Sequence, residues 1–211
     1  MEIVVQNEIL ILSALRAIYW PRKKALILSD MHLGKTGYFR SKGIPIPSTV
    51  LANDLQRLSL LIDTYSPETI VVAGDMFHHD YNADIDYFHT WRQLYNSIAF
   101  ILVPGNHDKL LNIDYQALSI QLTEKKHWLE PFTIIHEPVE RSETFMISGH
   151  IHPGYTMAGR ARQTLRLPCF IIGQRQIILP AFSLFTGLYT GHQTIDTNSY
   201  YLIGNDTIFK V

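Results

Sequence analysis

The chain has 211 residues, of which 46% are hydrophobic and 18% charged, a composition typical of one globular domain with a substantial core. Its formal net charge is −1, so the chain lacks the overall basic surplus of many nucleic-acid binders. Any phosphate-binding surface must therefore be local or depend on bound metal. We expect residues 1–211 to form a single domain.

The cellular compartment is indicated by cysteine content and by the first residues. The only cysteine is Cys169, which excludes an internal disulfide and fits a reducing compartment. The opening residues, MEIVVQNEILIL, lack the basic segment of a signal peptide, and no stretch approaches the roughly 18 apolar residues of a membrane span. The sequence therefore predicts a cytoplasmic protein that makes no use of a membrane.

The first half of the chain predicts alternating strands and helices. Short apolar runs (EIVV, EILIL, RAIYW) come first, and KALILSD then reads as a buried strand that ends at Asp30. A helix is predicted from Ser48, an N-cap residue type, to about Tyr65. The strand TIVVAGD, the helix DIDYFHTWRQLYN and the strand SIAFILVPGNHD follow. This alternation predicts a mainly parallel sheet.

The second half predicts short strands separated by turn signals. These strands are FTIIHEP, TFMISGH, QTLRLPCFIIG, QIILPAF, YYLIG and TIFKV. They indicate a second sheet, mixed or antiparallel, within the same two-sheet domain.

Five predicted strands end in side chains that can bind a metal. Ligands bind outside the carboxyl ends of strands in α/β sheets, so these side chains should converge. Each motif alone is more simply a polar turn or a buried histidine, but five such strand ends together indicate a metal site. Imidazole, carboxylate and amide ligands without cysteine suit Mn²⁺, Fe or Zn²⁺. The converging residues are Asp30, His32, Asp75, Asn106, His107, His136, His150 and His152.

The order of these motifs resembles the calcineurin-like metallophosphoesterase superfamily. The blocks D-x-H, G-D, G-N-H-D, H and G-H-x-H occur in that order between Asp30 and His152. The resemblance implies an α/β fold in which two mixed β-sheets are sandwiched between helices. It also implies a metal-dependent phosphoesterase.

Two longer segments are similar to a narrower family, the ligase-associated DNA-damage-response endonucleases. These segments are ALRAIYWPRKKALILSDMHLGKTGYFRSKGIPIP and LRLPCFIIGQRQIILPAFSLFTG. This bacterial branch is related to repair nucleases of the Mre11 and SbcD kind. The resemblance implies DNA as substrate, a role in DNA repair, and functional association with an ATP-dependent DNA ligase, a helicase and an exonuclease. It leaves the oligomeric state open.

The superfamily pattern implies two divalent metal ions. Asp75 would bridge them, because one carboxylate has two oxygens. We expect Mn²⁺, with Fe, Zn²⁺ and Mg²⁺ as alternatives. Asp30, His32, Asp75 and His152 would bind the first ion, and Asp75, Asn106, His136 and His150 the second.

The same pattern implies the chemistry. A hydroxide held between the two metals would attack phosphorus in line. His107 would protonate or stabilise the leaving oxygen, and Asp108 would orient His107. Arg40 and His78 are further candidates for substrate contact, with an exposed polar loop as the alternative for each. Arg160, Arg162 and Arg166 form a basic stretch that would suit a polynucleotide or simply alternate on a strand.

Three functions follow from these observations. The leading prediction is a DNA endonuclease. The second keeps the site and changes the substrate to a small or cyclic nucleotide or another small phosphoester, as a phosphodiesterase or phosphomonoesterase. The third is a binding-only descendant of the fold. It is disfavoured because no predicted ligand is missing from the sequence.

Overall fold

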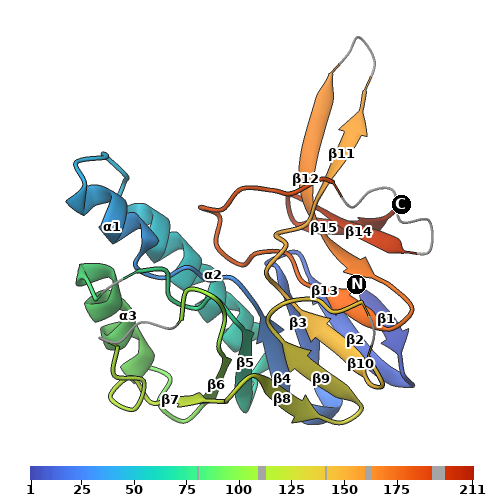
Figure 1. The fold of residues 1–211 in the computed structure, drawn as a ribbon, viewed down its shortest axis with the longest axis horizontal. Coiled ribbons are helices and arrows are strands. Elements are labelled where there is room, and N and C mark those ends of the chain that lie inside the picture. Colours follow the sequence, from blue (N-terminus) through green and yellow to red (C-terminus); the bar gives the residue numbers. More distant parts are fainter. Residues whose placement is uncertain (80, 109–112, 141, 160–162, 192–197) are drawn as a thin grey trace.

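Two β-sheets pack against each other, and helices lie along the other side of the first sheet (Figure 1). The computed structural model describes residues 1–211 except 80, 109–112, 141, 160–162 and 192–197. No helix in this described part of the chain is long and apolar enough to cross a membrane.

The first sheet has seven strands, hydrogen-bonded in chain order. Neighbours up to the fourth strand are antiparallel, and those from the fourth onward are parallel. The predicted parallel sheet is therefore confirmed for the segment that alternates with helices. The strands are β1 (Glu2–Val5), β2 (Glu8–Ser13), β3 (Ala17–Trp20), β4 (Ala25–Leu28), β5 (Thr69–Ala73), β6 (Ala99–Val103) and β7 (Ile120–Leu122).

Helices connect the parallel strands. The predicted apolar stripe of α2 is confirmed, because Leu51, Leu55 and Leu58 are buried against the first sheet. The predicted bounds of α2 are confirmed, because Ser48 stands at the N-cap position and the helix ends at Tyr65. The Ser48 side chain, however, makes no capping hydrogen bond. The helices are the 3₁₀-helix η1 (Pro21–Lys23), α1 (Lys35–Ser41), α2 (Thr49–Tyr65) and α3 (Ala83–Gln93).

The second sheet has eight strands of mixed direction. Its order is β15-β14-β12-β13-β10-β9-β8, with β11 paired to β12. The pairs of β10 with β9 and with β13 are parallel, and the other pairs are antiparallel. The strands are β8 (Lys126–Leu129), β9 (Phe132–Ile135), β10 (Phe145–Ser148), β11 (Gly154–Ala158), β12 (Thr164–Ile172), β13 (Gln176–Ile178), β14 (Ser199–Gly204) and β15 (Thr207–Lys210).

The main core fills the space between the sheets. Ile27 and Val71 from the first sheet share one buried cluster with Ile134, Ile147 and Phe170 from the second. A second cluster joins the first sheet to α2 and α3. The predicted fold of two mixed sheets with helices is confirmed. The described α-helices all lie on the side of the first sheet.

Candidate metal centre

The polar ends of the strands are joined into one region by backbone hydrogen bonds. After β4 and β5, the N–H of Asp30 donates to the carbonyl oxygen of Gly74 at 3.0 Å. The N–H of His32 donates to the carbonyl oxygen of Asp75, also at 3.0 Å. After β6, the N–H of His107 donates to Asp75 Oδ1 at 2.9 Å. The predicted convergence of these three strand ends is therefore present.

Asp30, His32 and His152 form the first group of candidate ligands. One ligand atom from each residue lies within 4.8 Å of the others. The Nε2 atoms of His32 and His152 are 3.2 Å apart, and His152 Nε2 is 3.3 Å from Asp30 Oδ1. Two imidazole nitrogens and a carboxylate oxygen thus face one point, although the loops that carry them are far apart in the sequence.

Asp75, His136 and His150 form the second group. Their ligand atoms also lie within 4.8 Å of one another. His150 Nδ1 is 3.1 Å from His136 Nε2, which is 3.5 Å from Asp75 Oδ1. The two groups divide the predicted ligands as the superfamily pattern implies, with His150 and His152 in different groups. The bridging role of Asp75 stays a prediction.

Five of these side chains are carried by residues in the left-handed backbone region. The residues are Asp30, His32, Asp75, His150 and His152, with φ between 48° and 70°. A left-handed conformation is unfavourable for a side chain with a Cβ, and it persists only where the surroundings enforce it. Such conformations concentrate at functional sites. The sequence motifs contained no signal for this strain.

Gly74 allows His136 to approach Asp75. A Cβ on Gly74 would lie 2.1 Å from His136 Nδ1, and the φ of Gly74 is +83°. His136 Nδ1 is 3.0 Å from the carbonyl oxygen of Ala73. A carbonyl oxygen only accepts, so Nδ1 carries the proton and Nε2 presents its lone pair to the second group. The glycine before Asp75 therefore has a packing role as well as a conformational one.

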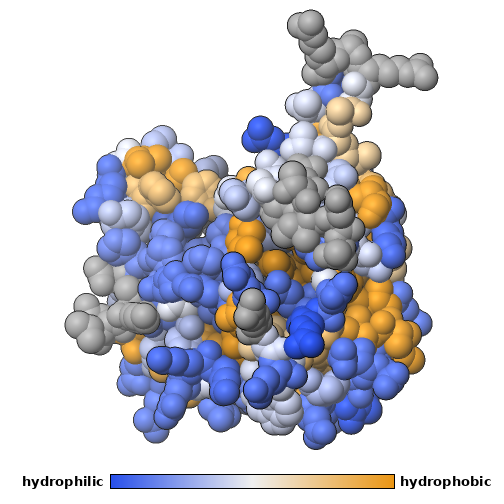
Figure 2. Space-filling view, turned by 45° about the vertical axis from the view of Figure 1, so that its right-hand side comes forward, coloured by the Kyte–Doolittle hydropathy of each residue, from blue (hydrophilic) through white to orange (hydrophobic). Residues whose placement is uncertain are grey.

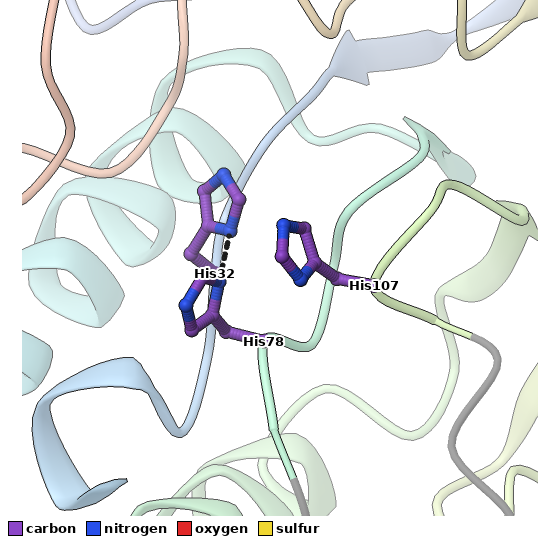
Figure 3. A group of neighbouring side chains, drawn as sticks. All are labelled: His32, His78 and His107. Carbon is purple, nitrogen blue, oxygen red and sulfur yellow. Dashed lines mark hydrogen bonds between the residues drawn. The ribbon is translucent and has the colours of Figure 1, made fainter. Parts of the chain in front are cut away.

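A third group, His32, His78 and His107, lies beside the first (Figure 3). His32 Nδ1 is 3.0 Å from His78 Nδ1, and the rings of His78 and His107 have centroids 4.3 Å apart. Burial lowers the pKa of His32 to about 2 and that of His78 to about 4, and neighbouring cationic groups add to both shifts. Both imidazoles are therefore neutral at neutral pH, and the neutral imidazole is the form that binds metals.

The predicted catalytic pair, His107 and Asp108, occupies contrasting environments. The His107 side chain is 43% exposed, and its Nε2 lies 4.0 Å from Asp75 Oδ2. Asp108 is buried, and its two carboxylate oxygens accept the backbone N–H groups of Phe77 and Gly105 at 2.9 and 2.8 Å. Burial raises the pKa of Asp108 to about 6, and those two hydrogen bonds oppose the rise. Through these bonds Asp108 connects the loop after β5 to the loop after β6. Its orienting effect on His107 stays a prediction.

The two remaining candidates differ in their surroundings. Asn106 is exposed and lines a surface cavity of about 340 Å³ together with His136, so it faces the region of the second group. Arg40 forms an ion pair with Asp84, which joins α1 to α3. Asp84 also accepts from the Thr36 hydroxyl at 2.6 Å. Arg40 thus has a structural partner, and its contact with substrate stays a prediction.

The donor atoms present fit divalent cations. Each of the first two groups offers two imidazole nitrogens and one carboxylate oxygen, with Asn106 nearby as a neutral oxygen donor. In each group two ring nitrogens lie 3.1–3.2 Å apart, so that one cation could contact both of them. Such nitrogen and oxygen donors suit first-row divalent metals.

Comparison with known proteins places the chain in a family. The sequence profile of the calcineurin-like phosphoesterases matches residues 23–168, which include all the candidate ligands. The chain belongs to the calcineurin-like phosphoesterase family and is a metal-dependent phosphoesterase. No curated protein sequence matches the chain.

Two solved structures are similar over most of the chain. The crystal structure of Pseudomonas putida nuclease MPE is 30% identical in sequence, with a TM-score of 0.86. The similarity covers 100% of this chain and 99% of that nuclease. Yfce, a phosphoesterase from E. coli, is 14% identical with a TM-score of 0.45, over 89% of this chain and 97% of its own.

Proposed function

We propose that the protein is a two-metal phosphodiesterase that cleaves DNA internally, with Mn²⁺ as the metal and bacterial DNA repair as its role. The paired ligand groups carry the phosphodiesterase part of this proposal. The similarity to the P. putida nuclease over the full length of both chains supports a nucleic acid as substrate.

The chain's own residues suggest how the reaction is organised. Two bound divalent cations would supply Lewis-acid activation of water and neutralise charge on the phosphate. The two ligand groups would hold these cations at the strand ends, so that a phosphate binds beside them. There the oxygen of a water molecule forms a bond to phosphorus in line with the leaving oxygen, and the water releases one proton to solvent. His107 is exposed enough to meet that leaving oxygen. As the P–O bond breaks, His107 Nε2 transfers its proton to the leaving oxygen.

Nicking of supercoiled plasmid tests the proposal. Metal-free protein would be resupplied with Mn²⁺ and compared with the His107→Ala variant and with a sample kept in chelator. We expect open-circular product from the wild type and little or none from the other two. Hydrolysis of a small phosphodiester without any plasmid nicking would contradict the DNA part and leave the phosphoesterase intact.

The charge of the chain favours one alternative substrate class. A net charge of −1 gives no general attraction for a polyanion, which suits a small or cyclic nucleotide or another small phosphoester. Salt dependence separates the two substrate classes. Polynucleotide binding weakens steeply with salt because counterions are released, whereas binding of a single phosphate ester changes little.

Partners and compartment complete the proposal. We propose functional association with an ATP-dependent DNA ligase, a helicase and an exonuclease, on the basis of the sequence resemblance. A cytoplasmic location agrees with Cys169, which is buried as a free thiol.

A further inference from the structure

An irregular segment, residues 181–189, runs from the second sheet past the first ligand group toward the helices (Figure 1). We call it the backing segment. The N–H of Ser183 donates to the carbonyl oxygen of Asp30 at 3.2 Å, and the N–H of Tyr189 donates to the carbonyl oxygen of His152 at 2.9 Å. Among the described residues, its backbone-to-backbone hydrogen bonds reach these two candidate ligands and no member of the second group. The backing segment therefore supports the first group in particular.

The far end of the backing segment meets the ribbon of β11 and β12, which projects from the body of the protein (Figure 1, Figure 2). The N–H of Gly154, the first residue of β11, donates to the carbonyl oxygen of Tyr189 at 2.9 Å. Two arginines of the predicted basic stretch, Arg160 and Arg162, follow β11 and lie outside the described residues. The backing segment thus connects the two loops that carry Asp30 and His152, at the root of this ribbon.

Two arginines hold the backbone of the segment in place. Arg16 Nη1 donates to the carbonyl oxygens of Ala181 and Ser183 at 3.1 and 3.0 Å. Arg57 Nη1 donates to the carbonyl oxygen of Phe182 at 2.9 Å, and the Arg57 guanidinium lies 4.5 Å from the centre of the Phe182 ring. Three consecutive buried residues outside any strand or helix thus have their carbonyl groups bound by two side chains. Without these arginines, the buried carbonyl groups would be left unpaired and the path of this stretch would be less constrained.

The arginines are fixed in turn by their own neighbours. Arg57 Nη2 donates to the carbonyl oxygen of Leu15 at 2.8 Å, and Arg57 Nη1 lies 2.9 Å from Asp54 Oδ1. Asp54 Oδ1 also accepts the N–H of Leu184 at 3.3 Å. Burial, and secondly the charge of Arg57, lower the pKa of Arg16 to about 10, so Arg16 is still a cation at neutral pH. Largely buried charges contribute little net stability, because each ion loses its hydration. This cluster is therefore better explained by the position that it imposes on the backing segment.

The strained backbone of Asp30 depends on such support. The φ of Asp30 is 54°, in the left-handed region, which a residue with a Cβ keeps only where its surroundings enforce it. Its N–H donates to the carbonyl oxygen of Gly74, and its own carbonyl oxygen accepts the N–H of Ser183. A shift of Ser183 would therefore change the direction of the Asp30 carboxylate, whose Oδ1 now lies 3.3 Å from His152 Nε2.

We propose that Arg16 and Arg57 are positioning residues for the first metal ion. They fix the carbonyl groups of residues 181–183, and this stretch holds the backbone of Asp30 in the conformation that directs its carboxylate at the other ligands. The proposal rests on the proposed function, because it assumes that two cations are bound. It predicts that loss of either arginine weakens binding of the first cation and leaves the second nearly unchanged.

Two variants remove the contacts independently, so that failure of one to fold leaves the other as a test. Arg16→Met removes both hydrogen bonds from Arg16 to the backing segment and keeps the ion pair between Arg57 and Asp54. The second variant combines Arg57→Met with Asp54→Asn, so that no unpaired carboxylate stays buried.

Arg92→Met is the matched control. Arg92 is buried and, like the other two arginines, donates to backbone carbonyl oxygens, those of Ile98 at 2.8 Å and Ser119 at 3.2 Å. These two residues directly precede β6 and β7, whereas the candidate ligands follow strands at their other ends. The control therefore removes a comparable arginine away from the metal centre.

Binding of Mn²⁺ to metal-free protein would be measured by isothermal titration calorimetry, and urea unfolding would give the stability of the same samples. We expect all three variants to lose stability. Arg16→Met and the double variant should bind one of the two ions roughly tenfold more weakly, because hydrogen bonds behind a metal ligand affect affinity to that extent. The other ion should bind within about twofold of the wild-type affinity, and Arg92→Met should bind both ions as the wild type does. Anomalous scattering from crystals at limiting Mn²⁺ assigns the weakened site, which should be the one beside Asp30.

Hydrolysis of bis(p-nitrophenyl) phosphate gives a second readout. If the arginines act through metal binding, the Mn²⁺ concentration that gives half the maximal rate should rise roughly tenfold in Arg16→Met. Excess Mn²⁺ should then restore most of the wild-type rate. A residue that served the chemical step directly would show no such rescue.

Wild-type affinity for both ions in Arg16→Met and in the double variant, despite a loss of stability similar to that of Arg92→Met, would overturn the proposal. Equal weakening of both ions, or weakening at the second site alone, would contradict the link to Asp30. The wild type tests the proposed function separately. Fewer than two bound Mn²⁺ per chain would contradict its two-metal part, whereas two bound Mn²⁺ without DNA cleavage would contradict its DNA part and leave the positioning role intact.

Discussion

His32 and His78 face each other through their Nδ1 atoms, which lie 3.0 Å apart although 46 residues separate them in the sequence. Only one of two such nitrogens can carry the shared proton. If His32 is the donor, its Nε2 keeps a free lone pair directed toward Asp30 and His152. His78 would then fix the ring of a metal ligand, in addition to any contact with substrate.

This relationship predicts the behaviour of two His78 variants. His78→Ala should weaken Mn²⁺ binding by roughly tenfold or more, because hydrogen bonds to the far nitrogen of a ligating histidine affect metal affinity to that extent. His78→Asn should retain most of the affinity, because asparagine Oδ1 occupies nearly the position of Nδ1. Isothermal titration calorimetry with Mn²⁺ measures both. Equal affinities in all three proteins would leave substrate contact as the role of His78.

The exposed His107 should affect the rate without affecting metal content. We expect His107→Ala to lower kcat for DNA by roughly 10²- to 10⁴-fold, as loss of a general acid does. Metal per chain, measured by mass spectrometry, should stay at the wild-type value. A kcat near the wild-type value would exclude His107 as the proton donor.

Gly74 offers a test of the packing around His136. Gly74→Ala should cost about 1 kcal/mol for the left-handed backbone alone, and more because the new Cβ would overlap His136. Gly43→Ala is the control, since Gly43 has a similar φ of +79° but no atom within 4 Å of a new Cβ. Chemical unfolding would give both losses, and only Gly74→Ala should also reduce Mn²⁺ binding. Equal losses in the two variants would contradict the packing role.

The buried thiol of Cys169 should make the folded protein less stable at alkaline pH. Burial raises the pKa of its thiol from 9.0 to about 12 in the folded protein. The unfolded thiol ionises first, so the free energy of unfolding falls as pH rises above 9.0 and continues to fall up to the folded value. Relative to Cys169→Ala, the wild type should lose about 1 kcal/mol between about pH 9 and about pH 10. Urea unfolding of both proteins at those pH values measures the difference, and a constant difference would contradict it.

The sequence predicted the parts of the fold that repeat a simple pattern. The buried runs of β4, β5 and β6 and the apolar stripe of α2 are local signals, and each appeared where it was expected. The helix α1 was not predicted, because its seven residues have no apolar stripe and include Gly37. The strand β11 was also missed, because glycine and proline at its start read as a turn.

The candidate site also has features that the sequence predicted and features that only the folded chain shows. Strand ends with Asp, His and Asn predicted which residues converge, because parallel strands end at one edge of a sheet. The contact between His32 and His78 and the ion pair between Arg40 and Asp84 depend on how separate loops pack, which no local pattern encodes. The left-handed backbone of five candidate ligands likewise became visible only in the folded chain.

The central claim is that two cations are bound by the two ligand groups. Crystals equilibrated with Mn²⁺ and measured near the manganese absorption edge would locate these ions by anomalous scattering. The account predicts two peaks roughly 3.5–4 Å apart, one beside Asp30, His32 and His152 and one beside Asp75, His136 and His150. A single peak, or peaks only at other places on the protein, would contradict it.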